Sequence, residues 1–129
     1  MKIFMIADDS PVIRKVGRRI IEDLGFVVVE AANGEEALAL ARDNMPDAIM
    51  VDWDMPRMSG IELVRELAAL PGADKARIIY CTSSLMVPEM TKAKRAGAAG
   101  FMMKPFNRKL LTEILTELGL METASEAAA

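Results

Sequence analysis

The sequence predicts an α/β protein: a doubly wound, five-stranded parallel sheet with helices on both faces. Five short apolar runs alternate with five segments of helical character, which is the pattern of a repeated βα unit. Such units cross over with a right-handed sense and place helices on both faces of the sheet. In addition, residues 48–51 are apolar without interruption, as in a strand buried on both faces. A helical hairpin bundle is the alternative, but it does not explain the β-branched runs at residues 26–29 and 78–79.

Each expected element has a local signal. Helix starts are marked by capping residues, by proline at the first helical position and by a Ser59-to-Glu62 capping box. Glycines 25, 97 and 119 mark helix ends. The expected strands cover residues 2–7, 26–31, 48–51, 77–82 and 99–103. The expected helices begin at Ser10-Pro11, Asn33-Gly34, Ser59-Gly60, near Pro88 and near Asn107.

Within the helices, apolar residues at helical spacing predict the buried face. For the first helix this stripe is predicted to be Val12, Val16, Ile20 and Leu24. The second expected helix has apolar positions that include Ala37, Leu38 and Ala41, and the third continues through Ile61, Val64, Leu67 and Ala68. The last helix is expected to place Leu111, Ile114, Leu115 and Leu118 inward.

Composition narrows the class of protein. A chain of 129 residues, 52% hydrophobic and 27% charged, is expected to fold as one globular domain. Its net charge of −3 gives no reason to expect a nucleic-acid surface. No apolar run approaches the roughly 20 residues of a membrane span, and no signal peptide is expected. One cysteine, Cys81, suits a reducing cytosol, so a cytoplasmic location is predicted.

The domain is expected to cover residues 1–120, with residues 121–129 forming a flexible tail. No second module is expected, so any effect on other molecules is expected to pass through a protein–protein contact. A monomer is expected. The absence of histidine excludes His-based catalysis and leaves oxygen ligands, hence a hard cation, for any metal site.

Reactive side chains follow four of the five predicted strands. Asp8 and Asp9 end the first strand, Asp52 the third, Thr82 the fourth and Lys104 the fifth. Because parallel strands end at one edge of a sheet, these groups are expected to converge there. Three neighbouring carboxylates repel one another, so a cation must sit among them. Lys104 supplies one positive charge and Mg²⁺ would supply two more, which would let one carboxylate act as a nucleophile toward phosphorus.

These residues resemble a known family. The segments Asp8-Asp9-Ser10, Asp52-Trp53-Asp54-Met55-Pro56 with Gly60, Thr82-Ser83 and Lys104-Pro105-Phe106 are similar to the signature of the receiver domain of two-component response regulators. The similarity is greatest to the single-domain chemotaxis (CheY-like) type and covers residues 1–120. It implies the flavodoxin-like strand order 2-1-3-4-5.

The resemblance also implies roles. Asp52 would be the phosphoacceptor; Asp8, Asp9, Asp52 and the backbone carbonyl of Asp54 would hold Mg²⁺. Thr82 and Lys104 would contact the phosphoryl group, and the Lys104–Pro105 bond would be cis. Phe101 would change rotamer with Thr82 as the switch, and Ser84 and Asp54 would modulate the reaction.

The implied donor is a phosphohistidine on a histidine kinase or phosphotransfer protein. The implied target, a flagellar motor switch protein in chemotaxis relatives, would bind the surface of the fourth helix, fifth strand and fifth helix. The chain would therefore be a signalling phosphoacceptor rather than an enzyme with an external substrate. A phosphate sink or relay intermediate is the nearest alternative.

Two residues depart from the pattern of the receiver family. The residue at position 54 is more often neutral in the family, and the extra charge of Asp54 is expected to tighten Mg²⁺ binding and to alter the lifetime of the acyl phosphate. Phe101 lacks the phenol hydroxyl of some relatives.

A haloacid-dehalogenase-like phosphatase would share Asp52-x-Asp54, but its nucleophile motif comes on the first strand. A binding module that is not phosphorylated would not need the intact acidic set.

Overall fold

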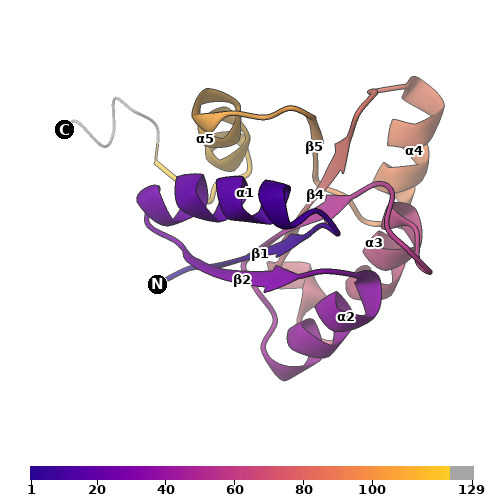
Figure 1. Ribbon diagram of the computed structural model, residues 1–129. Coiled ribbons are helices and arrows are strands. Elements are labelled where there is room, and N and C mark those ends of the chain that lie inside the picture. Colours follow the sequence, from indigo (N-terminus) through magenta and orange to yellow (C-terminus); the bar gives the residue numbers. More distant parts are fainter. Residues whose placement is uncertain (123–129) are drawn as a thin grey trace.

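The computed structural model describes residues 1–122, which form five strands and five α-helices in strict alternation (Figure 1). The predicted βα repeat is confirmed. Within residues 1–122, the only additional element is one 3₁₀ turn, η1, after Pro71-Gly72. In chain order the elements are β1 (Ile3–Ala7), α1 (Pro11–Asp23), β2 (Val27–Ala31), α2 (Gly34–Asp43), β3 (Ala48–Asp52), α3 (Gly60–Ala68), η1 (Ala73–Lys75), β4 (Arg77–Thr82), α4 (Val87–Ala96), β5 (Gly100–Met103) and α5 (Arg108–Glu117).

The sheet is parallel throughout, with strand order β2-β1-β3-β4-β5. This confirms the doubly wound, flavodoxin-like arrangement. β3 is the central strand, and all five of its residues are buried, as its uninterrupted apolar run predicts. The order reverses direction between β1 and β3, so a crevice opens beyond the carboxyl ends of these two strands. Asp52 is the last residue of β3 and therefore lies at this crevice.

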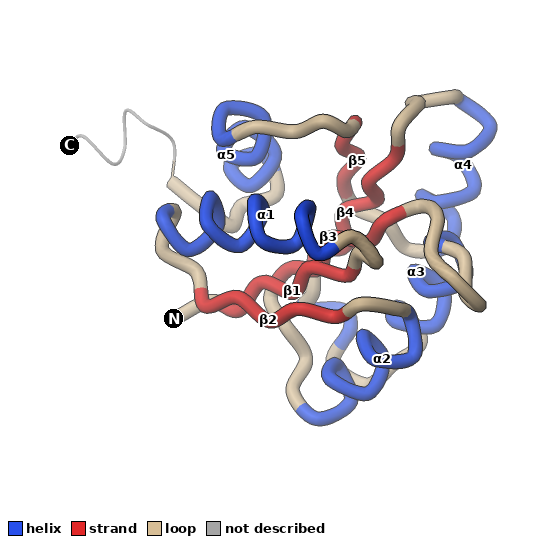
Figure 2. Tube along the Cα trace, in the orientation of Figure 1, coloured by secondary structure: helices blue, strands red, loops and turns tan. Residues whose placement is uncertain are grey.

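Helices cover the sheet in two layers (Figure 2). α1 and α5 pack on one face around a core that includes Phe4, Ile21 and Leu111. α2, α3 and α4 pack on the other face, where Leu38, Leu63 and Ala93 belong to the core. Each strand therefore contributes alternate side chains to two separate cores, which explains why the strand sequences are apolar on both faces.

The predicted stripe of α1 is wrong at its first two positions. Val12 is 68% exposed and Val16 is 46% exposed, whereas Gly17 and Ile21 are buried. Residues four apart drift by about 40° around a helix, so a stripe of three such steps does not stay on one face. The helix instead approaches the sheet at Gly17, where a Cβ would lie 3.1 Å from Ile6 Cδ1. The missing side chain at Gly17 lets α1 pack closely.

The helix starts agree with the sequence signals. The side chains of Ser10, Asn33, Ser59 and Asn107 each accept a hydrogen bond from a backbone N–H in the first turn of the helix that follows. In the part of the chain that the structure describes, no helix has the length and apolar character that crossing a bilayer requires. Most of the predicted tail, residues 123–129, lies outside the described residues.

Candidate phosphoacceptor site

Three carboxylates meet at the carboxyl edge of the sheet. Asp8 and Asp9 directly follow β1, and Asp52 ends the neighbouring strand β3. One ligand oxygen from each lies within 4.8 Å of the others. Asp8 and Asp52 are 2% and 4% exposed, whereas Asp9 is open to solvent. The sequence predicts that these three residues converge, and the structure confirms it.

Lys104 joins two of the carboxylates. Its Nζ lies 2.6 Å from Asp8 Oδ2 and 2.6 Å from Asp52 Oδ1. The residue follows β5, and its backbone N–H donates to the carbonyl of Thr82 at 2.8 Å, so the loop is tied to the end of β4. The Lys104–Pro105 peptide bond is cis, as the resemblance implied. An ammonium group from the edge strand thus reaches across β4 to the central strand.

Burial and the neighbouring charges change the proton affinity of this pair. Burial, together with the negative charges of Asp8 and Asp9, raises the pKa of Asp52, although the hydrogen bond from Lys104 opposes this rise. Burial disfavours the charged form of Lys104, but its hydrogen bonds to Asp52 and Asp8 outweigh burial and raise its pKa. Lys104 therefore remains an ammonium at neutral pH. The ionised form of Asp52 depends on nearby positive charge.

The backbone after β1 is held by three further hydrogen bonds. Asp8 N–H donates to the carbonyl of Ala31 on β2 at 3.1 Å, and Ser10 N–H donates to Asp8 Oδ1 at 2.9 Å. Arg14 Nη1, one turn into α1, donates to the carbonyl of Asp8 at 2.7 Å. Sequence reasoning did not find this role of Arg14. Its position on the first turn after the acidic pair was the one available signal.

Gly60 allows the loop after β3 to fold back tightly on the strand. A Cβ on this residue would lie 2.5 Å from the carbonyl oxygen of Asp52 and 2.7 Å from Trp53 Cα, both of them backbone atoms. Gly60 N–H donates to the carbonyl of Trp53 at 3.0 Å. Only glycine fits here, because every other residue would push the strand end away from α3. This gives a physical reason for the glycine in the Asp52-to-Gly60 motif.

Thr82 is buried at the end of β4, with 2% exposure. Its hydroxyl donates to the carbonyl of Ser84 at 3.2 Å and accepts from the N–H of Ser84 at the same distance. Glu89 Oε1, on the first turn of α4, is 3.5 Å from the Thr82 hydroxyl. Sequence reasoning missed Glu89. No periodicity or motif connects it to the end of a strand.

The remaining predicted residues surround this edge. Asp54 and Ser84 are exposed. Phe101 on β5 is half-buried against the core beneath α2, α3 and α4, called here the α2–α4 core. Phe101 also lines a shallow hollow of about 260 Å³ along α4, together with Val87, Met90, Thr91 and Lys94. The metal-binding carbonyl of Asp54, the modulating roles of Asp54 and Ser84 and the rotamer change of Phe101 stay predictions.

The donor set fits a hard divalent cation. All three clustered groups are carboxylates, and Mg²⁺ prefers oxygen ligands. Three carboxylates against one ammonium leave an excess of negative charge at the edge, so a divalent cation would bring the charges into balance. The exposed side of the cluster, at Asp9, gives an ion access from solvent.

Fold and site together define an aspartate-centred acidic edge on a doubly wound sheet, and comparison with known proteins gives the family. Residues 4–116 match the response regulator receiver domain. The chemotaxis protein CheY of Halobacterium salinarum is 34% identical over 117 residues, covering 91% of this chain and 96% of that protein. The chain belongs to the response regulator receiver family and is a receiver domain of the CheY type.

Solved structures agree with this assignment. The chemotaxis protein CheY4 of Vibrio cholerae superposes with a TM-score of 0.86 at 31% identity, covering 94% of this chain and 99% of that chain. A response regulator from Burkholderia pseudomallei, solved with a phosphorylated aspartic acid and a calcium ion, has a TM-score of 0.82 at 30% identity and covers 99% of this chain and 71% of that chain. Receiver membership replaces the haloacid-dehalogenase alternative, whose motif order this chain lacks.

Proposed function

We propose that Asp52 accepts a phosphoryl group from a phosphohistidine on a histidine kinase or phosphotransfer protein. One observation carries this assignment: the buried carboxylate at the end of the central strand is held by Lys104 and stands beside Asp8 and Asp9. CheY-type receivers are signalling phosphoacceptors. Among the clustered acids, Asp52 is the one that belongs to the central strand, whose carboxyl end borders the topological switch point between β1 and β3.

In this reaction a carboxylate oxygen of Asp52 forms a bond to phosphorus while the phosphorus–nitrogen bond of the donor breaks. The electron pair returns to the donor imidazole. Lys104 is placed to neutralise negative charge on the phosphoryl oxygens, because its ammonium group already contacts Asp52. The hydroxyl of Thr82 would donate a hydrogen bond to a phosphoryl oxygen.

Receiver domains of this family bind Mg²⁺ at an acidic pocket. In this chain Asp8, Asp9, Asp52 and the backbone carbonyl of Asp54 would hold the ion, which supplies neutralising charge at the phosphoryl oxygens when bound. Asp8 is already engaged by Lys104 and Ser10, whereas Asp9 is exposed. Asp9 is therefore the carboxylate best placed for direct contact with the ion.

The output is expected to pass through the surface of α4, β5 and α5. Large apolar side chains are exposed there and in the loop before α4: Leu85 (36%), Met86 (60%), Val87 (74%) and Met103 (43%). Such a patch suits a protein target. We propose a chemotaxis target such as the flagellar motor switch, which the similarity to chemotaxis proteins supports, with a phosphate sink or relay as the alternative. A monomer in the cytoplasm, with self-dephosphorylation as its only turnover, completes the proposal.

Incubation with acetyl phosphate and Mg²⁺, followed by intact mass spectrometry, tests the assignment. The unmodified chain and Asp54→Asn should each gain one phosphoryl group, and Asp52→Asn should gain none. Asp54→Asn is the matched control, because it removes one carboxylate two residues away. Labelling of Asp52→Asn to the same extent would refute Asp52 as the acceptor.

The same experiment tests Asp54. Its additional charge is expected to tighten Mg²⁺ binding and to alter the lifetime of the acyl phosphate, so Asp54→Asn should change both. Mg²⁺ titration and the rate of label loss measure these quantities. Unchanged values in both would remove the proposed modulating role.

A further inference from the structure

Glu89 connects α4 to β4 through one carboxylate oxygen. Tyr80 donates its hydroxyl to Glu89 Oε1 at 2.7 Å, and the Thr82 hydroxyl lies 3.5 Å from the same oxygen. Tyr80 and Thr82 are two residues apart on β4 and therefore point to the same face of the sheet. Both are 2% exposed, so these contacts are largely shielded from water.

Tyr80 is a fixed anchor for this oxygen. Its ring belongs to the α2–α4 core, and its Cε1 lies 3.0 Å from where a Cβ on Gly60 would stand. A buried phenol hydroxyl needs a hydrogen-bond partner, and Glu89 supplies it. Burial, together with the hydrogen bond to Glu89, raises the pKa of Tyr80, so the hydroxyl stays protonated and remains a donor.

The start of α4 has little else to hold it. Its N-cap, Met86, makes no side-chain capping hydrogen bond, whereas α1, α2, α3 and α5 each begin with one. Residues 83–88, which lead from β4 into the first turn, are all exposed, and Ala93 is the only buried residue within α4. The Tyr80–Glu89 hydrogen bond therefore ties a lightly packed helix to the strand that ends at Thr82.

Thr82 has a single hydroxyl proton. In this structure it is directed to the Ser84 carbonyl, with Glu89 Oε1 at longer range. A phosphoryl group on Asp52 would claim the same proton, so Thr82 would have to leave both acceptors. Any interaction that holds Glu89 close to β4 therefore favours the arrangement without phosphate.

We propose that Glu89, anchored by Tyr80, is a positioning residue that holds Thr82 and the start of α4 in the unphosphorylated arrangement. This inference rests on the proposed function of Asp52. In this chain the tyrosine hydroxyl on β4 takes a coupling role that Phe101, its register partner on β5, has no hydroxyl to perform. Loss of the tie shifts the population toward the arrangement that binds phosphate or a phosphoryl mimic.

The test compares Tyr80→Phe, which removes only the hydroxyl, with Thr91→Val. Thr91 is the matched control, because its hydroxyl bonds within α4 to the carbonyl of Val87 and is exposed. Beryllofluoride with Mg²⁺ serves as the phosphoryl mimic. Trp53, the single tryptophan and the neighbour of Asp52, reports binding by fluorescence.

Tyr80→Phe should bind beryllofluoride about tenfold more tightly than the unmodified chain, and Thr91→Val should match the unmodified chain. Glu89→Gln keeps an acceptor oxygen without the charge and should fall between the two. A Tyr80→Phe affinity equal to that of the unmodified chain would overturn the proposal.

Amide hydrogen exchange over residues 87–91 gives a readout that needs no phosphoryl chemistry. Without ligand, exchange in Tyr80→Phe should be about tenfold faster than in the unmodified chain, and Thr91→Val should show a smaller change. If the unmodified chain fails to bind beryllofluoride, the proposed function of Asp52 fails. Exchange at α4 then decides separately whether the tie exists, and rates equal to those of the control would overturn it.

Discussion

Replacing Lys104 by methionine would leave two buried carboxylates without their shared cation. Lys104 Nζ contacts Asp8 and Asp52 at 2.6 Å each, and the side chains are 19%, 3% and 5% exposed, respectively. At an effective dielectric of about 20, a unit-charge contact at this separation is worth about 6 kcal/mol before desolvation is subtracted. Desolvation cancels much of this, and removing one partner of a buried ion pair costs about 3–5 kcal/mol in free energy of unfolding.

The free energy of unfolding is measured by urea denaturation at pH 7 without divalent cations, with circular dichroism as the signal. The free energy of unfolding of Lys104→Met should be lower than that of the unmodified chain by about 3–5 kcal/mol. Asp52→Asn in the same background should recover part of this loss, because one uncompensated charge disappears. A coupling free energy of about 1–3 kcal/mol is expected from the double-mutant cycle. A loss below about 1 kcal/mol with no recovery would refute the electrostatic account of the site.

The pH dependence has a definite sign. Because the pKa of Lys104 is raised in the folded chain, its contribution to stability is fully present below the unfolded pKa near 10.5 and is lost as the pH rises through the higher folded value. In Lys104→Met this alkaline loss should be absent. Toward acidic pH the stability of Lys104→Met should approach that of the unmodified chain. Burial raises the pKa of Asp52, so without Lys104 this carboxylate can be neutralised by a proton as the pH falls.

Three further predictions concern positions around the site. Gly60→Ala should cost about 2 kcal/mol or more in unfolding free energy and reduce phosphorylation, because its Cβ would meet the backbone of Asp52 at 2.5 Å; urea unfolding and acetyl phosphate labelling measure this. Burial raises the pKa of Cys81 to about 12, so stability should fall by about 1.4 kcal/mol per pH unit above pH 9, and Cys81→Ala should lack this slope in urea unfolding. Arg14→Met should weaken Mg²⁺ binding about tenfold in a titration, because the carbonyl of Asp8 loses its donor. Wild-type values in any of these measurements would contradict the corresponding structural reason.

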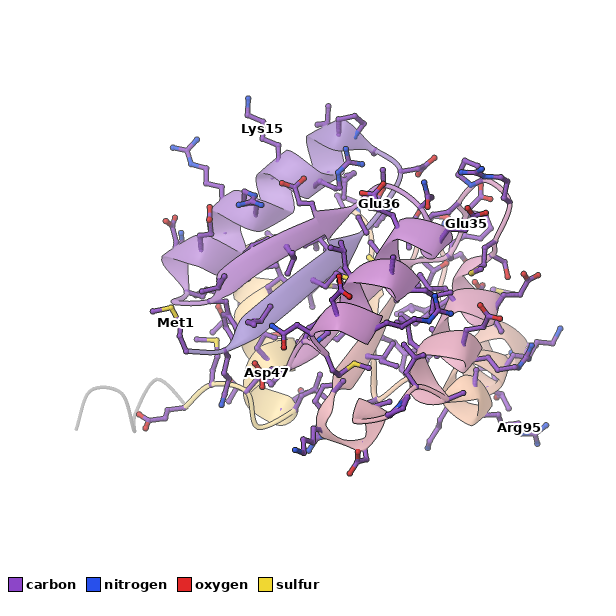
Figure 3. All side chains as sticks on the ribbon, turned by 90° about the horizontal axis from the view of Figure 1, so that it is seen from below. Met1, Lys15, Glu35, Glu36, Asp47 and Arg95 are labelled. Atoms are coloured by element: carbon purple, nitrogen blue, oxygen red, sulfur yellow. The ribbon has the colours of Figure 1, made fainter. Side chains whose placement is uncertain are left out.

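The surface charge on α1 illustrates how an exposed position differs from a paired one. Lys15 points away from the sheet into solvent (Figure 3). Arg14 and Arg18, on the same helix, instead pair with Glu30 on β2 at 3.1 and 2.7 Å. The sequence shows four basic residues between positions 14 and 19, but it does not show which of them are neutralised by the adjacent strand.

The sequence alone was sufficient for the α/β class, the order of elements, most helix caps and the convergence of Asp8, Asp9, Asp52 and Lys104. These features follow from local periodicity and from one topological rule, that parallel strands end at one edge. The buried face of α1 could not be read in the same way. Gly17, with no side chain, packs against Ile6 of the sheet, whereas Val12 and Val16 carry the apolar signal and are exposed to solvent.

Only the tertiary structure decided the hydrogen bonds between residues distant in sequence or on different elements. Arg14 reaches back to the carbonyl of Asp8, and Glu89 receives the hydroxyl of Tyr80. A charged side chain at either position is equally compatible with an exposed helix face, so composition and spacing do not distinguish the two environments. The distinction arises when packing fixes the distance and direction between elements, because hydrogen bonds form only over a narrow range of both.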